Sequence, residues 1–217
     1  VNSQSGSVLG RIAPLGIFAT HYGLEDQIAW AMEDAEITHP NTICTQACAI
    51  YVLAISAAIK RLADPEQLYQ HVRSLARTLR FEPDVISALA NASTSSGSAT
   101  AHVLDILQNA FWQLLHAPCL EDGILHTIQR GGDTSLNASV CGGLLGAVYG
   151  KVWIPEAWTE TILDCCPEVG QEGVAHPRPG CMWPADVLEL AARLIQLPAR
   201  MVVPESVPLH RLGVYRM

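Results

Sequence analysis

This 217-residue chain has little positive charge and few signs of β-structure. Lysine and arginine number 13 against 21 aspartate and glutamate residues, which gives a formal net charge of −8. Nucleic-acid partners select for basic surfaces, so this balance argues against them. No pair of alternating apolar runs joined by a hairpin turn occurs along the sequence, which argues against a sheet.

Long apolar runs and a secretory leader are also missing. The longest apolar run, Ala47 to Ile59, is shorter than the roughly 20 residues that span a bilayer. It lies in mid-chain, so it is not a signal peptide, and no membrane partner is expected. The seven cysteines are scattered, which together with the missing leader predicts a reducing, cytoplasmic location.

The cysteines fall into two groups. Cys44, Cys48 and Cys141 lie in apolar runs and are interpreted as small core residues. Cys165, Cys166 and Cys181 lie near His176, which leaves zinc binding as an alternative. Their spacing matches no common zinc module, so structural or free thiols are favoured. A thiol-dependent enzyme is a further alternative, but no local signature supports it.

Apolar residues recur with helical periodicity along most of the chain, and helix caps separate the periodic segments. The sequence therefore predicts an all-α fold, a compact bundle of eight or more helices within one soluble domain spanning residues 1–217. Residues 167–184 are expected to form a loop and 198–217 an extended tail. The expected helices are 24–36, 41–62, 65–79, one from 83 to the Ser93–Ser98 loop, 99–115, 120–129, 133–149, 155–163 and 184–197.

The most informative segment runs from Gly131 to Ala138 and reads Gly-Gly-Asp-Thr-Ser-Leu-Asn-Ala. Two glycines before an acidic residue allow a tight turn and a close approach to a ligand. Asp133 and Thr134 suit the start of a helix, where free backbone N–H groups favour an anion. The helix that follows is nearly uncharged, and we expect it to be the most buried of the fold. The simplest alternative is an ordinary capped core helix.

This segment resembles the signature of the ADP-ribosylglycohydrolase family, whose members remove ADP-ribose from modified proteins. There it reads Gly-Gly-Asp-Thr-Asp-Thr-Asn-Ala, and both aspartates and the second threonine bind a pair of Mg²⁺ or Mn²⁺ ions. The resemblance implies Asp133 as a metal ligand, whereas Ser135 and Leu136 replace the other two. A binuclear Mg²⁺ site needs several carboxylates, so the sequence predicts a metal site that is weakened or lost.

Further segments resemble the same family in the same order, from about Ser5 to Leu197. The resemblance implies the orthogonal helical fold of this family. The matching segments are Ser5–Gly16, which resembles a glycine-rich loop ending in Met-Arg-Ile-Ala-Pro-Leu-Gly, then Thr38-His39-Pro40, Ala110–Leu115 and Ile154–Trp158.

The resemblance also implies which residues contact ADP-ribose or an ADP-ribosylated protein. We expect the loop from Ser5 to Gly10 to approach the ribose or phosphates, although a disordered terminus is the simpler interpretation. His39 is implied as a ligand contact, against the alternative of a helix-end histidine bonded to backbone. Arg11 is equally compatible with a phosphate contact and with a structural role. The complete implied set is Ser5, Gly6, Ser7, His39, Gly131, Gly132 and Thr134.

Two family motifs, Gly-Asp-Ala-x-Gly and Thr-Asp-Asp, do not occur in the chain. We expect either a fragment without the N-terminal part of the family domain or a shortened descendant. The functional expectation is an ADP-ribosylglycohydrolase-like protein whose hydrolase activity is weakened or lost. The alternative is a non-catalytic relative that binds ADP-ribose or serves as a structural, crystallin-like protein.

Overall fold

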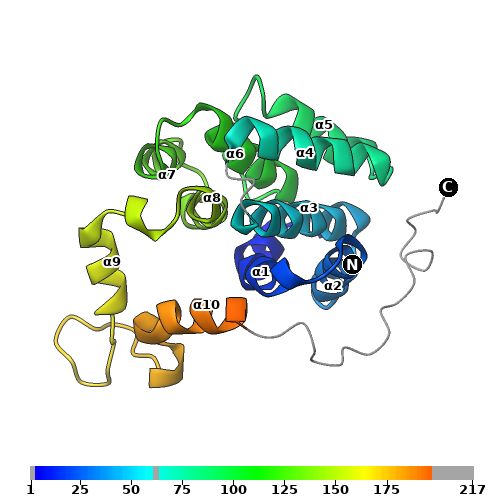
Figure 1. Ribbon diagram of the computed structural model, residues 1–217. Helices are drawn as coiled ribbons and strands as arrows, with labels where there is room; N and C mark the ends of the chain where they lie inside the picture. The colour runs from blue at the N-terminus through cyan, green and yellow to red at the C-terminus, as the bar shows by residue number, and fades with distance from the viewer. Residues whose placement is uncertain (1–2, 61–63, 197–217) are drawn as a thin grey trace.

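A computed structural model describes residues 3–60 and 64–196, and over these residues the protein is all-α, as the sequence predicts. Its one β-bridge joins Ser5 to His102, and the described ranges contain no strand. Figure 1 shows the helices as a bundle around α3, with α9 and α10 to one side. The α-helices are α1 (Ser7–Phe18), α2 (Leu24–Glu36), α3 (Thr42–Ile59), α4 (Pro65–Thr78), α5 (Pro83–Asn91), α6 (Val103–His116), α7 (Leu120–Gln129), α8 (Thr134–Tyr149), α9 (Glu156–Leu163) and α10 (Val187–Gln196). Four 3-10 helices complete the set: η1 (Ala19–His21), η2 (Lys151–Trp153), η3 (Gly180–Met182) and η4 (Pro184–Asp186).

The core is built around α3. Fourteen of its 18 residues are buried, and α1, α2, α4 and α8 pack against it. Gly16 allows α1 to approach closely, since a Cβ there would come 2.8 Å from Ile55 Cβ. Across the helix, the buried Tyr51 hydroxyl donates to the Val140 carbonyl of α8 at 2.8 Å. By length and composition α3 could cross a membrane, but 78% of it is buried inside the bundle, as in a core helix.

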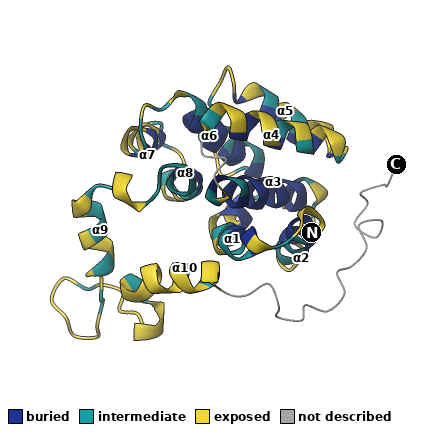
Figure 2. Cartoon of the chain, viewed as in Figure 1, coloured by how far each residue is buried: buried dark blue, intermediate teal, exposed yellow. Residues whose placement is uncertain are grey.

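The expectation that residues 133–149 form the most buried helix is wrong. Only five of the 16 residues of α8 are buried, whereas α3 is buried almost all round (Figure 2). The apolar, glycine-rich composition that suggested burial is real, but one face of α8 has no helix packed over it. Gly146 shows this directly, since a Cβ added there would meet nothing within 4 Å.

The expectation of a loop from Ser5 to Gly10 is wrong from Ser7 onward, where α1 begins. Gly10 and Pro14 discourage a helix locally, and Pro14 has no N–H to donate to the carbonyl of Gly10. Burial of Val8 and Leu9 against the core offsets that local cost. Tertiary packing therefore decides the conformation of this segment.

Local signals place other helices correctly. Asp64 caps α4 by accepting from Gln67 N at 2.8 Å, and Pro65 is the first residue of that helix, as predicted. The predicted helix from residue 99 begins later, at Val103, because the carbonyls of Ala99 and Ala101 accept hydrogen bonds from two other segments instead of from their own helix. Leu62 and Leu197, where two predicted helices end, and the predicted tail 198–217 lie outside the described residues.

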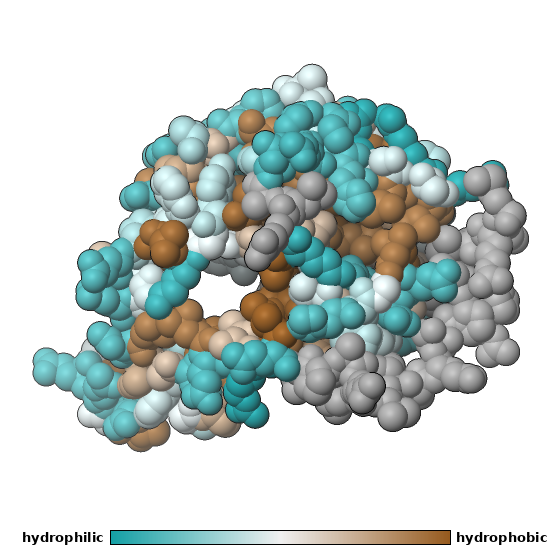
Figure 3. Space-filling view, in the orientation of Figure 1, coloured by the Kyte–Doolittle hydropathy of each residue, from teal (hydrophilic) through white to brown (hydrophobic). Residues whose placement is uncertain are grey.

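The segment from Lys151 to Gln196, called the C-terminal arm below, contains no buried residue (Figure 2). It holds nine of the 13 exposed large hydrophobic side chains in the described part of the chain. Its α10 packs along α1, and His21 Nε2 bonds to the Ile195 carbonyl. Figure 3 shows a hollow between the arm and the helical body, bordered by hydrophobic residues.

Candidate functional site

Residues 99–101 tie together two helix starts that are more than a hundred residues apart in sequence. Gly6 N donates to the Ala101 carbonyl at 2.7 Å, at the start of α1. The Asn137 amide donates to the Thr100 carbonyl at 3.1 Å, and Asp133 N donates to the Ala99 carbonyl at 3.3 Å, both from the start of α8. Three consecutive carbonyls, from Ala99 to Ala101, thus accept hydrogen bonds from both predicted ligand-binding segments.

Both glycines of the motif are required by the backbone. Gly131 and Gly132 have φ of 75° and 68°, the left-handed region that side chains disfavour. At Gly132 there is a second reason, because a Cβ would collide with the Ala99 carbonyl oxygen. At Gly131 a Cβ would meet nothing within 4 Å, so only its dihedral angle calls for glycine. The predicted tight turn is confirmed.

Asp133 is the N-cap of α8, as predicted, and its Oδ1 accepts from Leu136 N at 3.3 Å. Thr134 begins the helix, and its N–H donates to the Gly132 carbonyl at 3.0 Å. Ser135 is exposed, whereas Leu136 is half-buried and packs against the core. At the three positions where the resemblance implies metal ligands, the chain therefore offers one carboxylate, one hydroxyl and one hydrocarbon side chain.

These residues do not fit a pair of Mg²⁺ or Mn²⁺ ions. Such ions take about six oxygen ligands each and are held through several carboxylates. Within residues 3–60 and 64–196, no three His, Cys, Asp or Glu side chains are placed to share an ion. This also applies to Cys165, Cys166, His176 and Cys181, whose thiols are free, so the zinc alternative gains no support. A metal site at Asp133 requires ligands beyond those described here.

Asn137 is a buried polar residue whose role the sequence alone does not reveal. It is 2% exposed, and its amide donates to the carbonyls of Thr100 and Asp133. Its Oδ1 is buried without a hydrogen-bond partner among the described residues. An unsatisfied buried acceptor costs about 1–3 kcal/mol. The sequence signal for this burial was position: Asn137 comes four residues after the N-cap Asp133, on the helix face opposite the exposed Ser135.

His39 lies between α2 and α3, beside the start of α1. Its Nε2 is 3.4 Å from Ser7 Oγ, and its Nδ1 is 2.9 Å from Thr38 Oγ1. The Ser5 hydroxyl in turn donates to Ser7 Oγ at 3.2 Å. The alternative of a histidine bonded to backbone is therefore wrong, since its partners are two hydroxyls. Among the predicted ligand-binding residues, Ser5, Ser7 and His39 form one polar cluster.

Gly6 is buried beneath this cluster rather than exposed within it. A Cβ at Gly6 would collide with the Ile106 side chain of α6. Its backbone N–H is already used by Ala101. Gly6 therefore allows α1 to approach α6 and supports the backbone between Ser5 and Ser7.

Arg11 has a structural role, which decides between the two alternatives left by the sequence. Its Nη1 forms an ion pair with Asp34 at 2.6 Å, and its Nη2 donates to the Asp34 carbonyl at 2.7 Å. The same Nη2 donates to Thr38 Oγ1 at 3.1 Å. Arg11 thus ties α1 to the end of α2 and fixes the hydroxyl that holds His39. Because Thr38 Oγ1 accepts from Arg11, its own hydroxyl proton can be donated to His39 Nδ1. An Nδ1 that accepts a hydrogen bond places the imidazole proton on Nε2, which faces Ser7.

Arg130 secures the turn before α8, a role that sequence reasoning missed. Its guanidinium donates to Asn109 Oδ1 and to the Gly97 carbonyl, the latter at 2.5 Å. Burial lowers the pKa of Arg130, and the nearby Asp105 carboxylate opposes that shift. The arginine thus links the Gly131–Gly132 turn to α6 and to the loop that leads into residues 99–101.

Comparison with known proteins places the whole site within one family match. The family model for ADP-ribosylglycohydrolase matches residues 2–200. This chain belongs to the ADP-ribosylglycohydrolase family. The match includes both helix starts, His39 and the Gly131–Gly132 turn, so the site lies within the family domain.

Three relatives are similar over most of this chain. ADP-ribosylarginine hydrolase Tri1 of Pseudomonas putida is 27% identical over 160 residues, covering 73% of this chain and 42% of the relative. ADP-ribosylhydrolase ARH3 of Gallus gallus is 26% identical over 191 residues, covering 70% and 52%. An uncharacterized protein of Archaeoglobus fulgidus is 24% identical over 161 residues, covering 71% and 52%. The chain spans about half the length of the curated relatives it matches.

Proposed function

We propose that this chain binds ADP-ribose, free or attached to a protein, and that its own residues hydrolyse the linkage weakly or not at all. The observation that carries the proposal is the joining of the α1 and α8 starts by the carbonyls of Ala99, Thr100 and Ala101. Two of the relatives are named for hydrolysis of ADP-ribosyl linkages. The same family domain, with this arrangement of backbone, supports the same ligand class here.

The chemistry of the two helix starts suits a diphosphate and its sugars. The positive end of a helix dipole attracts anions, although the N–H groups of Thr134 and Leu136 at the α8 start are already bonded to Gly132 and Asp133. The hydroxyls of Ser5 and Ser7 and the ring of His39 can form hydrogen bonds to phosphate or ribose oxygens. No acidic side chain belongs to this hydroxyl cluster, although Asp34 lies nearby in its ion pair with Arg11. ADP-ribose carries both a diphosphate, which suits the helix starts, and ribose hydroxyls, which suit the cluster of Ser5, Ser7 and His39.

The proposed weakness in hydrolysis follows from the ligand set at α8. Asp133 is the single carboxylate among the three positions where the resemblance implies metal ligands, and it also caps the helix. Binding of ADP-ribose through hydroxyls, an imidazole and backbone N–H groups does not need a metal ion. We therefore propose that ligand binding is retained when metal-dependent turnover is not.

Calorimetric titration with ADP-ribose, with and without a chelator, tests binding, and release of ADP-ribose from arginine- and serine-modified proteins tests turnover. We expect weak binding that the chelator leaves unchanged and that His39→Ala lowers. His116→Ala is the matched control, since His116 is exposed at the end of α6. Chelator-sensitive release of ADP-ribose would overturn the proposal of weak or absent hydrolysis. No binding of ADP-ribose would instead support a structural role.

A further inference from the structure

A pocket lies at the other end of α3 from His39. It has a volume of about 330 Å³ and is formed by the start of α2 with the residues before it, the C-terminal part of α3, and His71 and Leu75 of α4. Lys60 directly follows the last residue of α3, and His39 lies three residues before the first. Since α3 has 18 residues and an α-helix rises about 1.5 Å per residue, roughly 27 Å separates the two ends.

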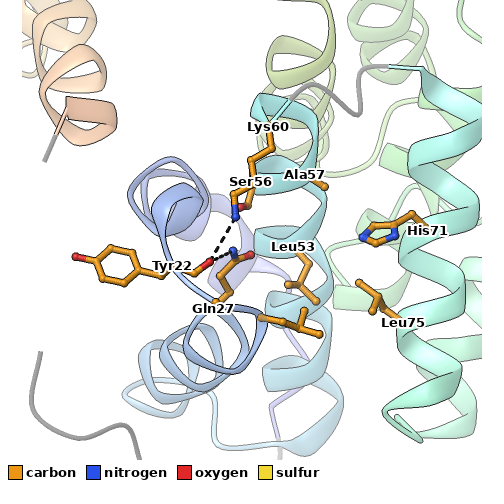
Figure 4. A pocket seen from close by; sticks show the side chains of 10 residues that line it. Tyr22, Gln27, Leu53, Ser56, Ala57, Lys60, His71 and Leu75 are labelled. Atoms are coloured by element: carbon orange, nitrogen blue, oxygen red, sulfur yellow. Dashed lines mark hydrogen bonds between the residues drawn. The ribbon is translucent and has the colours of Figure 1, made fainter. Parts of the chain in front are cut away.

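The walls of this pocket are mainly apolar, and its charge is of one sign. Leu53 of α3 and Leu75 of α4 face each other across it (Figure 4). Lys60 and His71 contribute the cationic and imidazole groups, and the lining residues within the described part of the chain include no aspartate or glutamate, although the Asp26 carboxylate lies next to Gly23. This is notable in a chain whose net charge is −8. Pockets of this size suit small ligands, with apolar contacts for affinity and a few polar groups for orientation.

The polar end of the pocket holds hydrogen-bonding groups that the protein itself does not fully use. Ser56 is 1% exposed, and its Oγ is buried without a partner among the described residues. Lys60 Nζ donates to the Tyr22 carbonyl at 3.4 Å, a long contact, while Gln27 Nε2 donates to the same carbonyl at 2.9 Å. Figure 4 shows Lys60 reaching across Ser56 toward Tyr22. Lys60 can leave Tyr22 without orphaning its carbonyl, since Gln27 still bonds to it.

We propose that this pocket binds a small monocarboxylate with a short apolar body. The apolar body lies between Leu53 and Leu75, and the carboxylate accepts from Lys60 Nζ. Movement of Lys60 toward the ligand uncovers the Ser56 hydroxyl, which then donates to the second carboxylate oxygen. A single lysine matches a singly charged carboxylate better than a dianionic phosphate, because an ammonium group supplies one positive charge.

Titration with sodium hexanoate, followed by amide chemical shifts, tests the proposal, with 1-hexanol as the matched neutral probe. We expect saturable binding of hexanoate and much weaker binding of hexanol. Lys60→Met should lower hexanoate affinity about tenfold, the usual scale for a lost hydrogen bond to a charged group. Arg77→Met removes an exposed cation of α4 that does not line the pocket, and it should change nothing.

Ala57→Leu provides an independent variant, since Ala57 lines the pocket and a larger side chain fills it. It should abolish hexanoate binding while leaving the helical circular dichroism unchanged. Equal affinity for hexanoate and hexanol, no effect of Lys60→Met, or no saturable hexanoate binding would overturn the proposal. ADP-ribose affinity should be the same in wild type and Lys60→Met, so this site and the proposed ADP-ribose site fail or succeed separately.

Discussion

The side chain of Leu136 lies over Gly10, where a Cβ added to the glycine would come 2.7 Å from Leu136 Cδ1. In the signature that this chain resembles, these two positions hold threonine and methionine. Here the larger side chain is on α8 and the smaller residue is on α1. The two residues that differ from the signature, Leu136 and Gly10, therefore share one space between α8 and α1. Leu136 replaces a possible ligand with a packing contact, and Gly10 makes room for it.

Leu136→Thr should destabilise the protein without creating a metal site. Loss of a half-buried leucine side chain above Gly10 leaves a gap that no neighbour fills, which costs about 1–2 kcal/mol. Urea denaturation measures this change, and Ser135→Thr is the control because Ser135 is exposed. Unchanged stability would mean that Leu136 does not pack on α1 as described.

The double variant Ser135→Asp, Leu136→Thr tests the metal ligands directly. It supplies the side chains of the family signature at α8, but the described residues offer no further cluster of acidic ligands. We expect no tight two-ion isotherm when Mg²⁺ or Mn²⁺ is added to wild type or to this variant. Wild-type binding of two ions with Asp133 as a ligand would contradict the proposal.

Gly131→Ala and Gly132→Ala form a matched pair. Both place alanine at a positive φ, which costs about 1–2 kcal/mol. Gly132→Ala also drives a methyl group into the Ala99 carbonyl, and overpacking of this kind adds about 1–3 kcal/mol. Thermal unfolding should therefore rank Gly132→Ala as clearly less stable than Gly131→Ala. Equal destabilisation would show that the 99–101 segment is not held against the turn.

Arg11→Met should weaken ADP-ribose binding although Arg11 itself is committed to Asp34. Without Arg11, the Thr38 hydroxyl loses the hydrogen bond that fixes it, so the His39 ring bonded to that hydroxyl is no longer held in place. The pair is partly exposed, so its direct contribution to stability is small, about 0.2–1 kcal/mol. We expect the drop in affinity to be smaller than for His39→Ala and larger than for Arg77→Met. Calorimetry on the three variants gives the order, and the reverse order would assign Arg11 to the ligand.

Stability should fall as pH rises above about 8.5, the ordinary pKa of a thiol. Burial raises the pKa of Cys141 to about 12, and it also raises that of Cys48. The folded state therefore keeps these thiols protonated, and their contribution is complete below the unfolded pKa. It is lost as pH rises toward the folded pKa, at up to about 1.4 kcal/mol per pH unit for each thiol.

Denaturation midpoints between pH 8 and 10 measure this loss, and Cys141→Ala should flatten the profile. Labelling of the native protein with a thiol reagent gives a parallel test. Cys165 and Cys181 are exposed and should react quickly, while Cys44, Cys48 and Cys141 are buried and should react only after unfolding. Fast reaction of Cys141 in the native state would contradict its placement in the core.

The sequence alone determined the helical class, most helix positions and the nature of the α8 start. These follow from local physics: a period of 3.6 residues, the Asp64–Pro65 cap of α4, and two glycines before Asp133. It also identified Cys44, Cys48 and Cys141 as core residues, which their burial confirms. The single-domain extent and the ligand roles of the site residues stay predictions.

Only the tertiary structure decided which other segment of the chain each residue packs against. Ser7–Phe18 is a helix in spite of Pro14 because its apolar face is buried against α3. The composition of α8 resembles that of a fully buried helix, yet one of its faces is left uncovered. The segment at residues 99–101 joins Gly6 to Asp133 through bonds between segments far apart in sequence. Periodicity and caps act within a few residues, so they specify elements, while the partner of each face is specified only when the whole chain packs.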